Sequence, residues 1–176
     1  MNTVSVLAGK YKGQKLQVPT PAHPLGSREK NALFNMLVPY LDGANVLDAF
    51  AGTGALGLEA LSRGARSATF IESHPGAVKI LRENIKDCKI FNTRVANFDS
   101  DETFDLIFAD PPYDHIDPTE LNHLTKFLKP SALLALSHPK GSTFSLKGCE
   151  IIRQNSYARC TLTLYKKSTP SAQTVV

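Results

Sequence analysis

Residues 45–57 have the sequence Asn-Val-Leu-Asp-Ala-Phe-Ala-Gly-Thr-Gly-Ala-Leu-Gly. The apolar run that ends in Asp48 predicts a buried strand, and Gly52, Gly54 and Gly57 then follow at the spacing of the dinucleotide fingerprint. Glycines at such a turn let a ligand approach the backbone closely, where a strand of a doubly wound sheet leads into its helix. Sites for NAD, FAD and S-adenosylmethionine share this spacing. The segment therefore predicts a nucleotide-cofactor site without deciding among the three.

Strands and helices alternate from residue 45 onward. Continuous apolar strands separated by helices are typical of a parallel sheet that is covered on both faces. We therefore expect an α/β fold with a Rossmann-like, doubly wound and mostly parallel sheet. Two last β segments, 149–155 and 158–165, are expected to pair antiparallel at the edge of this sheet. The other expected elements are strands at 45–49, 67–71, 93–97, 104–109 and 132–137, and helices at 55–63, 75–87 and 117–128.

The first part of the chain has a different pattern. Residues 4–8 and 14–18 flank a tip bounded by glycines, which predicts a β-hairpin. A helix is expected to begin at Ser27, as its N-cap, and to break near Pro39. The predicted organisation is a hairpin-plus-helix extension over residues 1–41, a main domain over 42–167 and a disordered tail over 168–176.

The protein has 176 residues and a net charge of +4, with the composition of a soluble globular protein. All the excess positive charge lies in residues 1–40, which carry five basic side chains against Glu29 alone. Such a local field attracts polyanions such as nucleic acid, although a solvated basic face would have the same composition. A tyrosine between lysines at the hairpin tip could also stack on a base. The candidate RNA-binding residues are Lys10, Tyr11, Lys12, Lys15 and Arg28.

Several classes of protein are disfavoured. No apolar stretch is long enough to span a bilayer, and the first residues do not resemble a signal peptide. Cys88, Cys149 and Cys160 have neither disulfide nor zinc spacing, and the histidines show no metal-ligand spacing. We therefore expect a cytoplasmic monomer with no membrane contact and no metal site.

An acidic residue, Glu72, ends the next predicted strand. A carboxylate at this position can bind both hydroxyls of a ribose. A pyrophosphate favours a helix N-terminus without nearby negative charge, whereas Asp48 suits an ammonium group. S-adenosylmethionine carries an amino-acid head and no pyrophosphate, so it is the expected cofactor. Phe98 would pack on its adenine ring, and Asp99 would accept from the adenine amine unless it belongs to a simple polar turn. The candidate cofactor-binding residues are Asp48, Phe50, Ala51, Gly52, Gly54, Glu72, Ser73, Phe98 and Asp99.

A second motif, Asp110-Pro111-Pro112-Tyr113, follows the apolar run 104–109. Two consecutive prolines fix two φ angles and remove two backbone donors, which predicts a stiff, extended rim at the carboxyl end of a strand. The carboxylate and carbonyls of this rim can accept hydrogen bonds from a planar amine, and its aromatic ring can stack on the amine's base. A proline-rich strand exit with no such role is the structural alternative. Asp110, Pro111, Pro112 and Tyr113 are the candidate catalytic residues.

These motifs carry a family resemblance. Residues 48–65, the Ile71-Glu72 pair and the Asp-Pro-Pro-Tyr rim resemble Rossmann-fold S-adenosylmethionine-dependent methyltransferases. More closely, the chain resembles the bacterial small-subunit ribosomal RNA guanine-N2 methyltransferase family D, to which residues 8–19, 32–37 and 157–165 are also similar. The resemblance implies methyl transfer to the exocyclic amine of a guanine in 16S rRNA, in the small ribosomal subunit or its assembly intermediate.

The chain departs from this family in one basic segment. His23-Pro-Leu-Gly-Ser-Arg28 stands where the family has an Arg-Pro-Thr-Thr-Asp-Arg-like segment, and only Pro24 and Arg28 are kept. In addition, His74 replaces an acidic residue that often follows the ribose-binding Glu. Neither departure touches the proposed reacting centre.

Other functions remain open from the residues alone. An NAD-dependent oxidoreductase would use the same glycines and Glu72, but it gives no role to the proline rim or the basic hairpin. A catalytically inert RNA-binding protein need not keep both Glu72 and Asp110. An adenine-amine DNA or RNA methyltransferase shares the rim, although a chain of this length leaves no room for a separate target-recognition domain.

Overall fold

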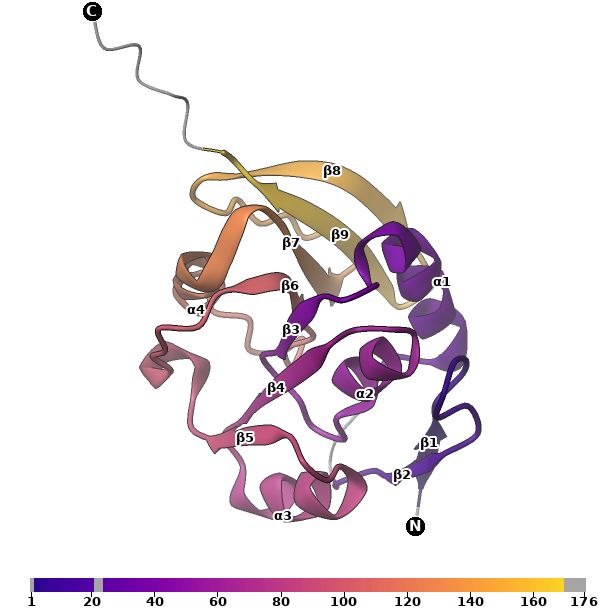
Figure 1. The fold of residues 1–176 in the computed structure, drawn as a ribbon. Coiled ribbons are helices and arrows are strands. Elements are labelled where there is room, and N and C mark those ends of the chain that lie inside the picture. Colours follow the sequence, from indigo (N-terminus) through magenta and orange to yellow (C-terminus); the bar gives the residue numbers. More distant parts are fainter. Residues whose placement is uncertain (1, 21–23, 170–176) are drawn as a thin grey trace, which may run out of the picture.

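The computed structural model describes residues 2–20 and 24–169. A seven-stranded sheet, in the order β5-β4-β3-β6-β7-β9-β8, lies beside a two-stranded sheet made of β1 and β2 (Figure 1). The strands are β1 Thr3–Ser5, β2 Lys15–Gln17, β3 Asn45–Asp48, β4 Ser67–Glu72, β5 Lys89–Asn92, β6 Phe104–Ala109, β7 Leu128–Pro139, β8 Cys149–Ser156 and β9 Cys160–Lys167. The helices are α1 Ser27–Leu37, α2 Ala55–Ser62, α3 Pro75–Asn84 and α4 Pro118–Leu124, with 3-10 turns η1 Val38–Tyr40, η2 Val95–Asn97 and η3 Thr125–Phe127. His23 and residues 170–176 of the predicted tail lie outside the described residues.

The large sheet is doubly wound, as predicted. Strands β3 to β7 pair in parallel, β9 pairs antiparallel with β7, and β8 pairs antiparallel with β9 at the edge. The chain passes outward from β3 to β5 and then returns to place β6 on the other side of β3. Ligands in open α/β sheets bind at such a switch point, beyond the carboxyl ends of the strands. Asp48 and Asp110 come from the two strands that flank this point.

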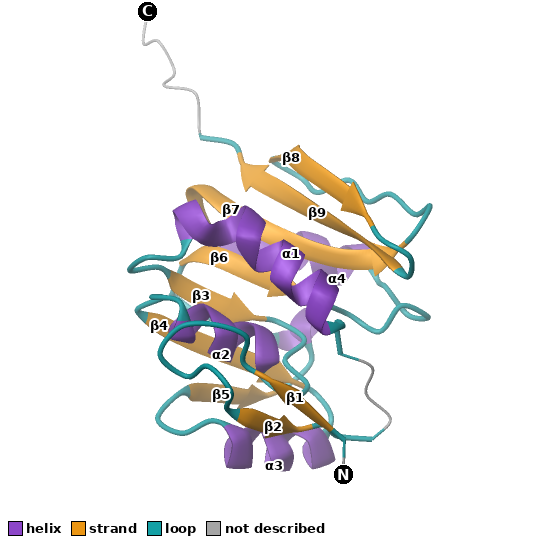
Figure 2. Ribbon diagram, turned by 90° about the vertical axis from the view of Figure 1, so that its right-hand side faces the viewer, coloured by secondary structure: helices purple, strands orange, loops and turns teal. Residues whose placement is uncertain are grey.

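Successive strand residues enter two different cores. Val46 and Leu106 face a core shared with α1, α2 and the hairpin, whereas Leu47 and Ile107 face a core shared with α4. Figure 2 shows α1 and α2 in front of the sheet and α4 behind it. Because both faces are buried, the strands need continuous apolar runs, and this is why they could be located from the sequence.

One strand and one helix cap were predicted wrongly. The third parallel strand, expected at 93–97, is β5 at Lys89–Asn92, and the η2 turn occupies the expected position. Strand β5 lies at the sheet edge with mostly exposed side chains, so it has no buried apolar run to mark it. The N-cap of α1 is Gly26, and Ser27 is the first helical residue.

The N-terminal hairpin packs on the main sheet through α2. Val6 and Leu16 are buried in the same core as Phe34 of α1. The tip ends against the last turn of α2, where the Lys10 amide donates to the Ser62 carbonyl at 2.8 Å. A Cβ at Gly9 would lie 1.8 Å from that carbonyl oxygen, so the contact requires glycine. The division at residue 41 stays a prediction.

Within residues 2–20 and 24–169, no helix is both long and apolar enough to cross a membrane.

Candidate active site

The glycine loop forms a tight turn between β3 and α2. Gly54 has a φ of +78° and caps α2, and a Cβ there would lie 2.3 Å from the Ile85 side chain. Gly57 faces the Phe70 ring, which a Cβ would also meet at 2.3 Å. Both positions therefore require glycine for local packing, the second because α2 lies directly on the sheet.

Gly52 differs from these two glycines because its missing side chain faces open space. Its φ is +51°, and no atom of the described residues lies within 4 Å of an added Cβ. Its amide donates to Glu72 Oε2 at 2.9 Å, while Glu72 Oε1 accepts from the His74 amide at 2.8 Å. The carboxylate at the end of β4 is thus held against the loop, and each oxygen keeps a lone pair for a further donor.

Asp48, at the end of β3, is a buried carboxyl group with one orphaned oxygen. Its Oδ2 accepts from the Gly57 amide at 2.9 Å, but its buried Oδ1 has no hydrogen-bond partner among the described residues. Burial raises the pKa of Asp48 to about 8 against the effect of the Gly57 hydrogen bond, and the Asp110 and Glu72 carboxylates add to the rise. A buried group of this kind favours a cationic or hydrogen-bond-donating ligand.

Asp110 lies at the end of β6, beside Ser137 of the neighbouring strand β7. Burial raises the pKa of Asp110 to about 6, while hydrogen bonds from the Ser137 hydroxyl and the Leu25 amide act in the opposite direction. The carboxyl group is therefore ionised at neutral pH and partly withdrawn from water. Leu25 lies two residues before the start of α1, so the segment before this helix also contacts the site.

The proline rim continues from Asp110 along the same edge. Pro111 is buried, and no backbone hydrogen bond to its carbonyl is found in the described part of the chain. The Pro112 carbonyl, in contrast, accepts from the His115 amide at 3.0 Å. The Tyr113 side chain is 37% exposed, and its hydroxyl contacts the Ser137 hydroxyl. The Pro111 carbonyl is thus a free acceptor, and the Asp110 carboxylate keeps lone pairs for a further donor.

The remaining cofactor candidates lie in different environments. Phe50 is partly buried against the core on the α4 side, and Ala51 donates its amide to the Ile71 carbonyl at 2.9 Å. Ser73 is exposed beside Glu72, and Asp99 is exposed with its carboxylate at the Ser100 amide, 3.1 Å away.

The structure does not support the role predicted for Phe98 as a surface for adenine. This side chain is only 2% exposed and forms edge-on contacts with Phe91 and Phe127. Phe98 therefore belongs to the core.

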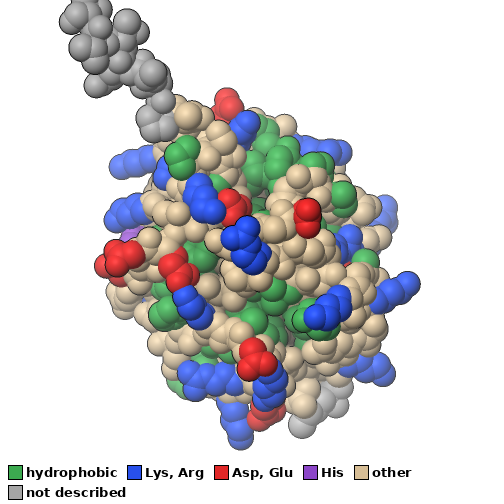
Figure 3. Space-filling view, viewed as in Figure 1, with side chains coloured by type: hydrophobic (Ala, Val, Ile, Leu, Met, Phe, Trp, Pro, Cys, Tyr) green, Lys and Arg blue, Asp and Glu red, His purple; other side chains and the backbone are tan. Residues whose placement is uncertain are grey.

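The predicted RNA-binding residues do not form one surface. Arg28 lies in the first turn of α1, at the catalytic edge. Tyr11 instead lines a hollow of about 890 Å³ that is bounded by the first residues of β3, β4, β5 and β6, which is the opposite edge. On the face of Figure 1, Lys and Arg side chains surround apolar atoms and do not gather into one patch (Figure 3). The hairpin tip thus lies away from Asp110.

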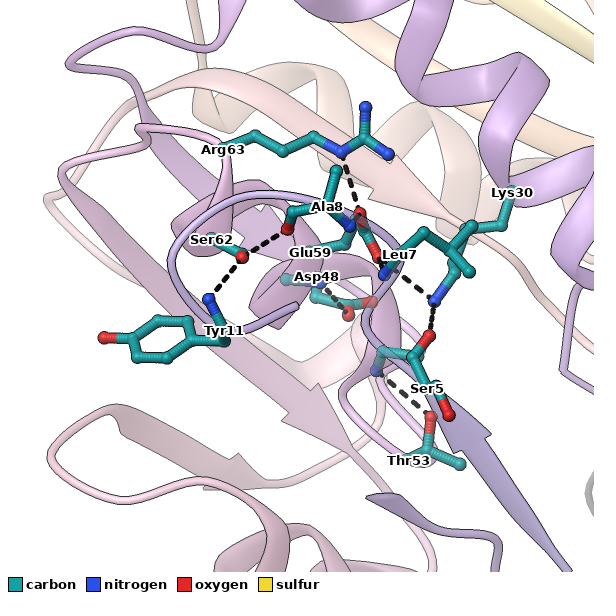
Figure 4. Close-up of polar contacts among 12 residues, drawn as sticks. Ser5, Leu7, Ala8, Tyr11, Lys30, Asp48, Thr53, Glu59, Ser62 and Arg63 are labelled. Carbon is teal, nitrogen blue, oxygen red and sulfur yellow. Dashed lines mark hydrogen bonds and ion pairs between the residues drawn. The ribbon is translucent and has the colours of Figure 1, made fainter. Parts of the chain in front are cut away.

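Glu59 was missed from the sequence, although it joins three elements (Figure 4). It is fully buried in α2 and accepts from the Leu7 amide at 2.7 Å and the Ala8 amide at 3.1 Å. It also pairs with Lys30 at 3.2 Å and with Arg63 at 2.8 Å. One of the five basic residues of the N-terminal segment, Lys30, is therefore buried and cannot contact RNA. The one available signal was a single acidic residue in an otherwise apolar helix.

Comparison with known proteins agrees with this fold. A family model described as Conserved hypothetical protein 95 matches residues 4–166. Ribosomal RNA small subunit methyltransferase D of Haemophilus influenzae is 35% identical over 154 residues, which cover 78% of this chain and 79% of that protein. The solved structure of yhhF from Escherichia coli has a TM-score of 0.85 at 28% identity, covering 96% of this chain and 99% of that one.

The sheet order, the switch-point site and these neighbours place the protein in the class of Rossmann-like methyltransferases. Within this class, the chain belongs to the ribosomal RNA small subunit methyltransferase D family. The resemblance found in the sequence is thereby confirmed.

The expected methyl donor, S-adenosylmethionine, is that of this class. NodS, an N-methyltransferase of Bradyrhizobium japonicum whose structure contains S-adenosyl-L-homocysteine, shares the fold with a TM-score of 0.67 at 16% identity, covering 84% of this chain and 89% of NodS. The residues of the site fit such a cationic donor. Glu72 and Asp110 are close enough to Asp48 to raise its pKa, and Asp48 Oδ1 has no hydrogen-bond partner within residues 2–20 and 24–169. The Glu72 and Asp110 carboxylates would repel the pyrophosphate of a dinucleotide.

Proposed function

We propose that this enzyme transfers a methyl group from S-adenosylmethionine to the N2 amine of a guanine in 16S rRNA of the small ribosomal subunit. The observation that carries the proposal is the position of the Asp110 carboxylate and the Pro111 carbonyl, two acceptors with lone pairs left for a substrate, at the switch point beside the glycine loop. The rRNA substrate is supported by the name of the Haemophilus influenzae relative. The choice of guanine rests on the family resemblance.

The donor would be held by the carboxylates around the glycine loop. Glu72, fixed by the Gly52 amide, would accept from the ribose hydroxyls, and the orphaned Asp48 Oδ1 would accept from the ammonium group. The exposed Asp99 carboxylate would accept from the adenine amine. When bound, S-adenosylmethionine supplies an electrophilic methyl group on its sulfonium.

Asp110 and Pro111 would activate the target amine. The lone pair of an amine on a purine ring is delocalised into the ring, which makes it a poor nucleophile. Two acceptors aimed at its hydrogens favour a pyramidal nitrogen and stabilise the positive charge that develops on it. Asp110 need not be a strong base, because the alkylated nitrogen is acidic and loses its proton readily. An ionised carboxylate at this position is therefore sufficient.

Tyr113 and Pro112 would hold the base in line with the methyl group. The Tyr113 ring is partly exposed, and its hydroxyl is fixed at Ser137, so the ring is oriented before RNA arrives. A stacked base cannot reach this rim, and we expect the target to be flipped out of a loop or helix. Because the ring does the stacking, a phenylalanine at position 113 should retain much of the activity that an alanine would lose.

RNA would approach at the catalytic edge, where Arg28 lies. The hairpin residues Lys10, Tyr11, Lys12 and Lys15 would contact a part of the small ribosomal subunit that is more distant from the methylated base. This assignment treats residues 1–41 as an RNA-contacting extension of a methyltransferase domain.

The test is methyl transfer from tritiated S-adenosylmethionine into small subunits from cells that lack this gene, compared with naked 16S rRNA and with DNA. The wild type should label the particle or its RNA, Asp110→Asn should lose most of the rate, and Asp114→Asn, an exposed neighbour, should not. Calorimetry should detect binding of S-adenosylmethionine and none of NAD. Label found only in DNA, or binding of NAD alone, would contradict the proposal.

A further inference from the structure

A second cleft lies at the catalytic edge of the sheet, beyond the carboxyl end of β7. It has a volume of about 410 Å³ and three walls: the first turn of α1, the residue after β7, and the β8–β9 turn. Strands β7 and β9 pair at Pro139 and Cys160, so both walls from the sheet lie at the catalytic edge. In Figure 2 the β8–β9 turn and the start of α1 lie on the right, on the same side as the carboxyl ends of the parallel strands. The cleft lining comprises Arg28, Glu29, Lys140, Ser156, Tyr157 and Ala158.

The cleft is linked to the catalytic rim through β7. Cys160, at the end of the β8–β9 turn, pairs with Pro139 of β7. Ser137, whose hydroxyl contacts the Tyr113 hydroxyl, precedes Lys140, the residue after β7, by three positions. An RNA strand with its target nucleotide at the rim would therefore place the adjacent nucleotide in or beside the cleft.

The cleft has unpaired positive charge. The ion pairs of residues 2–20 and 24–169 involve other cations, so Arg28 and Lys140 are not paired with any described carboxylate. Glu29 is the acidic residue of the lining, and its Oε2 lies 2.5 Å from where a Gly26 Cβ would be, so it is turned back toward the start of α1. Arg159, exposed at the same turn, adds to the positive charge.

The cleft also has an aromatic wall. Tyr157 is partly buried against the core, and its amide donates to the Cys160 carbonyl at 2.7 Å, which fixes the turn that carries it. Cations beside a firmly held aromatic ring are the usual elements of a single-strand nucleic-acid site, where phosphates meet the cations and bases stack on the ring. The volume is within the range of small-molecule sites and suits one nucleotide.

We infer that this cleft binds the nucleotide adjacent to the methylated base in single-stranded RNA, with Arg28 and Lys140 at its phosphate and Tyr157 stacked on its base. The inference rests on the proposed function for the identity of the RNA. This subsite could not be predicted from the sequence, because Lys140 and Tyr157 are 17 positions apart. The pairing of β7 with β9 brings both residues to the same cleft.

Direct binding of a labelled single-stranded oligoadenylate, measured over a series of KCl concentrations, tests this subsite. Lys140→Ala should weaken binding several-fold at low salt and reduce the slope of log K against log[salt] by about 0.7, the value for one lost phosphate contact on a single strand. Tyr157→Ala should weaken binding about 10-fold, and Tyr157→Phe should restore it. Lys79→Ala, an exposed cation on α3, is the control and should bind as the wild type does.

Binding of S-adenosylmethionine should be unchanged in all four variants, which shows that they are folded. If Lys140→Ala and Tyr157→Ala keep the affinity and salt slope of the wild type, the subsite is wrong even when methyl transfer to rRNA is observed. Equal weakening on a duplex probe would overturn the stacking role. Failure of the wild type to methylate rRNA would instead contradict the proposed function, because the binding measurement does not depend on transfer.

Discussion

Lys30 and Glu59 form a buried ion pair that joins α1 to α2, with 3.2 Å between Nζ and Oε2. The two side chains are 4% and 0% exposed. Burial lowers the pKa of Lys30, while the charge of Glu59 acts to keep the ammonium protonated. Lys30 also donates to the Ser5 carbonyl at 2.6 Å, so the pair connects α1, α2 and the hairpin.

Removing the charge of Glu59 should destabilise the protein strongly. In Glu59→Gln, a buried ammonium would lose its counter-ion, and breaking a buried pair in this way costs about 3 kcal/mol or more. Urea unfolding measures this free energy. Glu83→Gln, an exposed change on α3, is the control and should stay within about 0.5 kcal/mol of the wild type. A loss below about 1 kcal/mol in Glu59→Gln would show that the network is not needed to hold the extension in place.

Two glycines with similar backbone angles should respond differently to alanine. Gly54 and Gly141 have φ values of +78° and +87°, but an added Cβ meets the Ile85 side chain only at Gly54. Gly141→Ala should cost about 1 kcal/mol, from the left-handed conformation alone. Gly54→Ala should cost at least about 2 kcal/mol, because the collision adds to that strain. An added Cβ at Gly54 would also lie 2.6 Å from the Leu81 side chain, and equal losses in urea unfolding would mean that Leu81 and Ile85 move to admit the new methyl group.

The rate of methyl transfer should fall in acid with the ionisation of Asp110. The pKa of this carboxyl group is raised to about 6, and its ionised form is the one that accepts from the amine. With S-adenosylmethionine at saturating concentration, kcat/KM for RNA should therefore be level above about pH 7 and decline as pH falls through about 6. In Ser137→Ala, the loss of a hydrogen bond to the carboxylate raises the pKa further, so the decline should begin at a higher pH.

The pH dependence shows whether Ser137 acts on the pKa of Asp110 or only supports the structure. A Ser137→Ala enzyme with a lower rate and an unchanged pH profile would contradict it. Ser137→Thr keeps a hydroxyl and should restore the wild-type profile.

Binding of S-adenosylmethionine should release a proton at neutral pH. The pKa of Asp48 is raised to about 8, so the free protein carries this proton at pH 7. An ammonium group at Oδ1 favours the ionised form, and the proton leaves as the donor binds. Affinity should accordingly rise between pH 6 and pH 8. Calorimetry in buffers of different ionisation enthalpy should give about one proton released by the wild type and close to none by Asp48→Asn, which keeps an acceptor for the Gly57 amide.

Sequence patterns located the elements around the site because each strand there is buried on both faces. The runs before Asp48 and Asp110 are continuous and apolar, and the parallel arrangement then brings their carboxyl ends to one edge. Strand β5 has no such run, and this is why the sequence pattern predicted the strand at 93–97, a few residues after its actual position at Lys89–Asn92. Phe98 was misjudged because its partners, Phe91 and Phe127, belong to segments distant from one another in the sequence.

The remaining features depend on contacts between distant elements. Ser137 gives no signal in the sequence, yet strand pairing places it against both Asp110 and Tyr113. Likewise, the charge count could not show that Lys30 is buried or that the hairpin tip reaches the far end of α2. Both facts follow from the docking of the hairpin on the last turn of that helix.

Identification of the methylated nucleoside tests the central claim most directly. Small subunits from cells lacking the gene would be labelled with tritiated S-adenosylmethionine, and their RNA would be digested to nucleosides and separated. The account predicts label in N2-methylguanosine, present with the wild type and Asp114→Asn and lost with Asp110→Asn. Label in N6-methyladenosine, or undiminished label with Asp110→Asn, would contradict it.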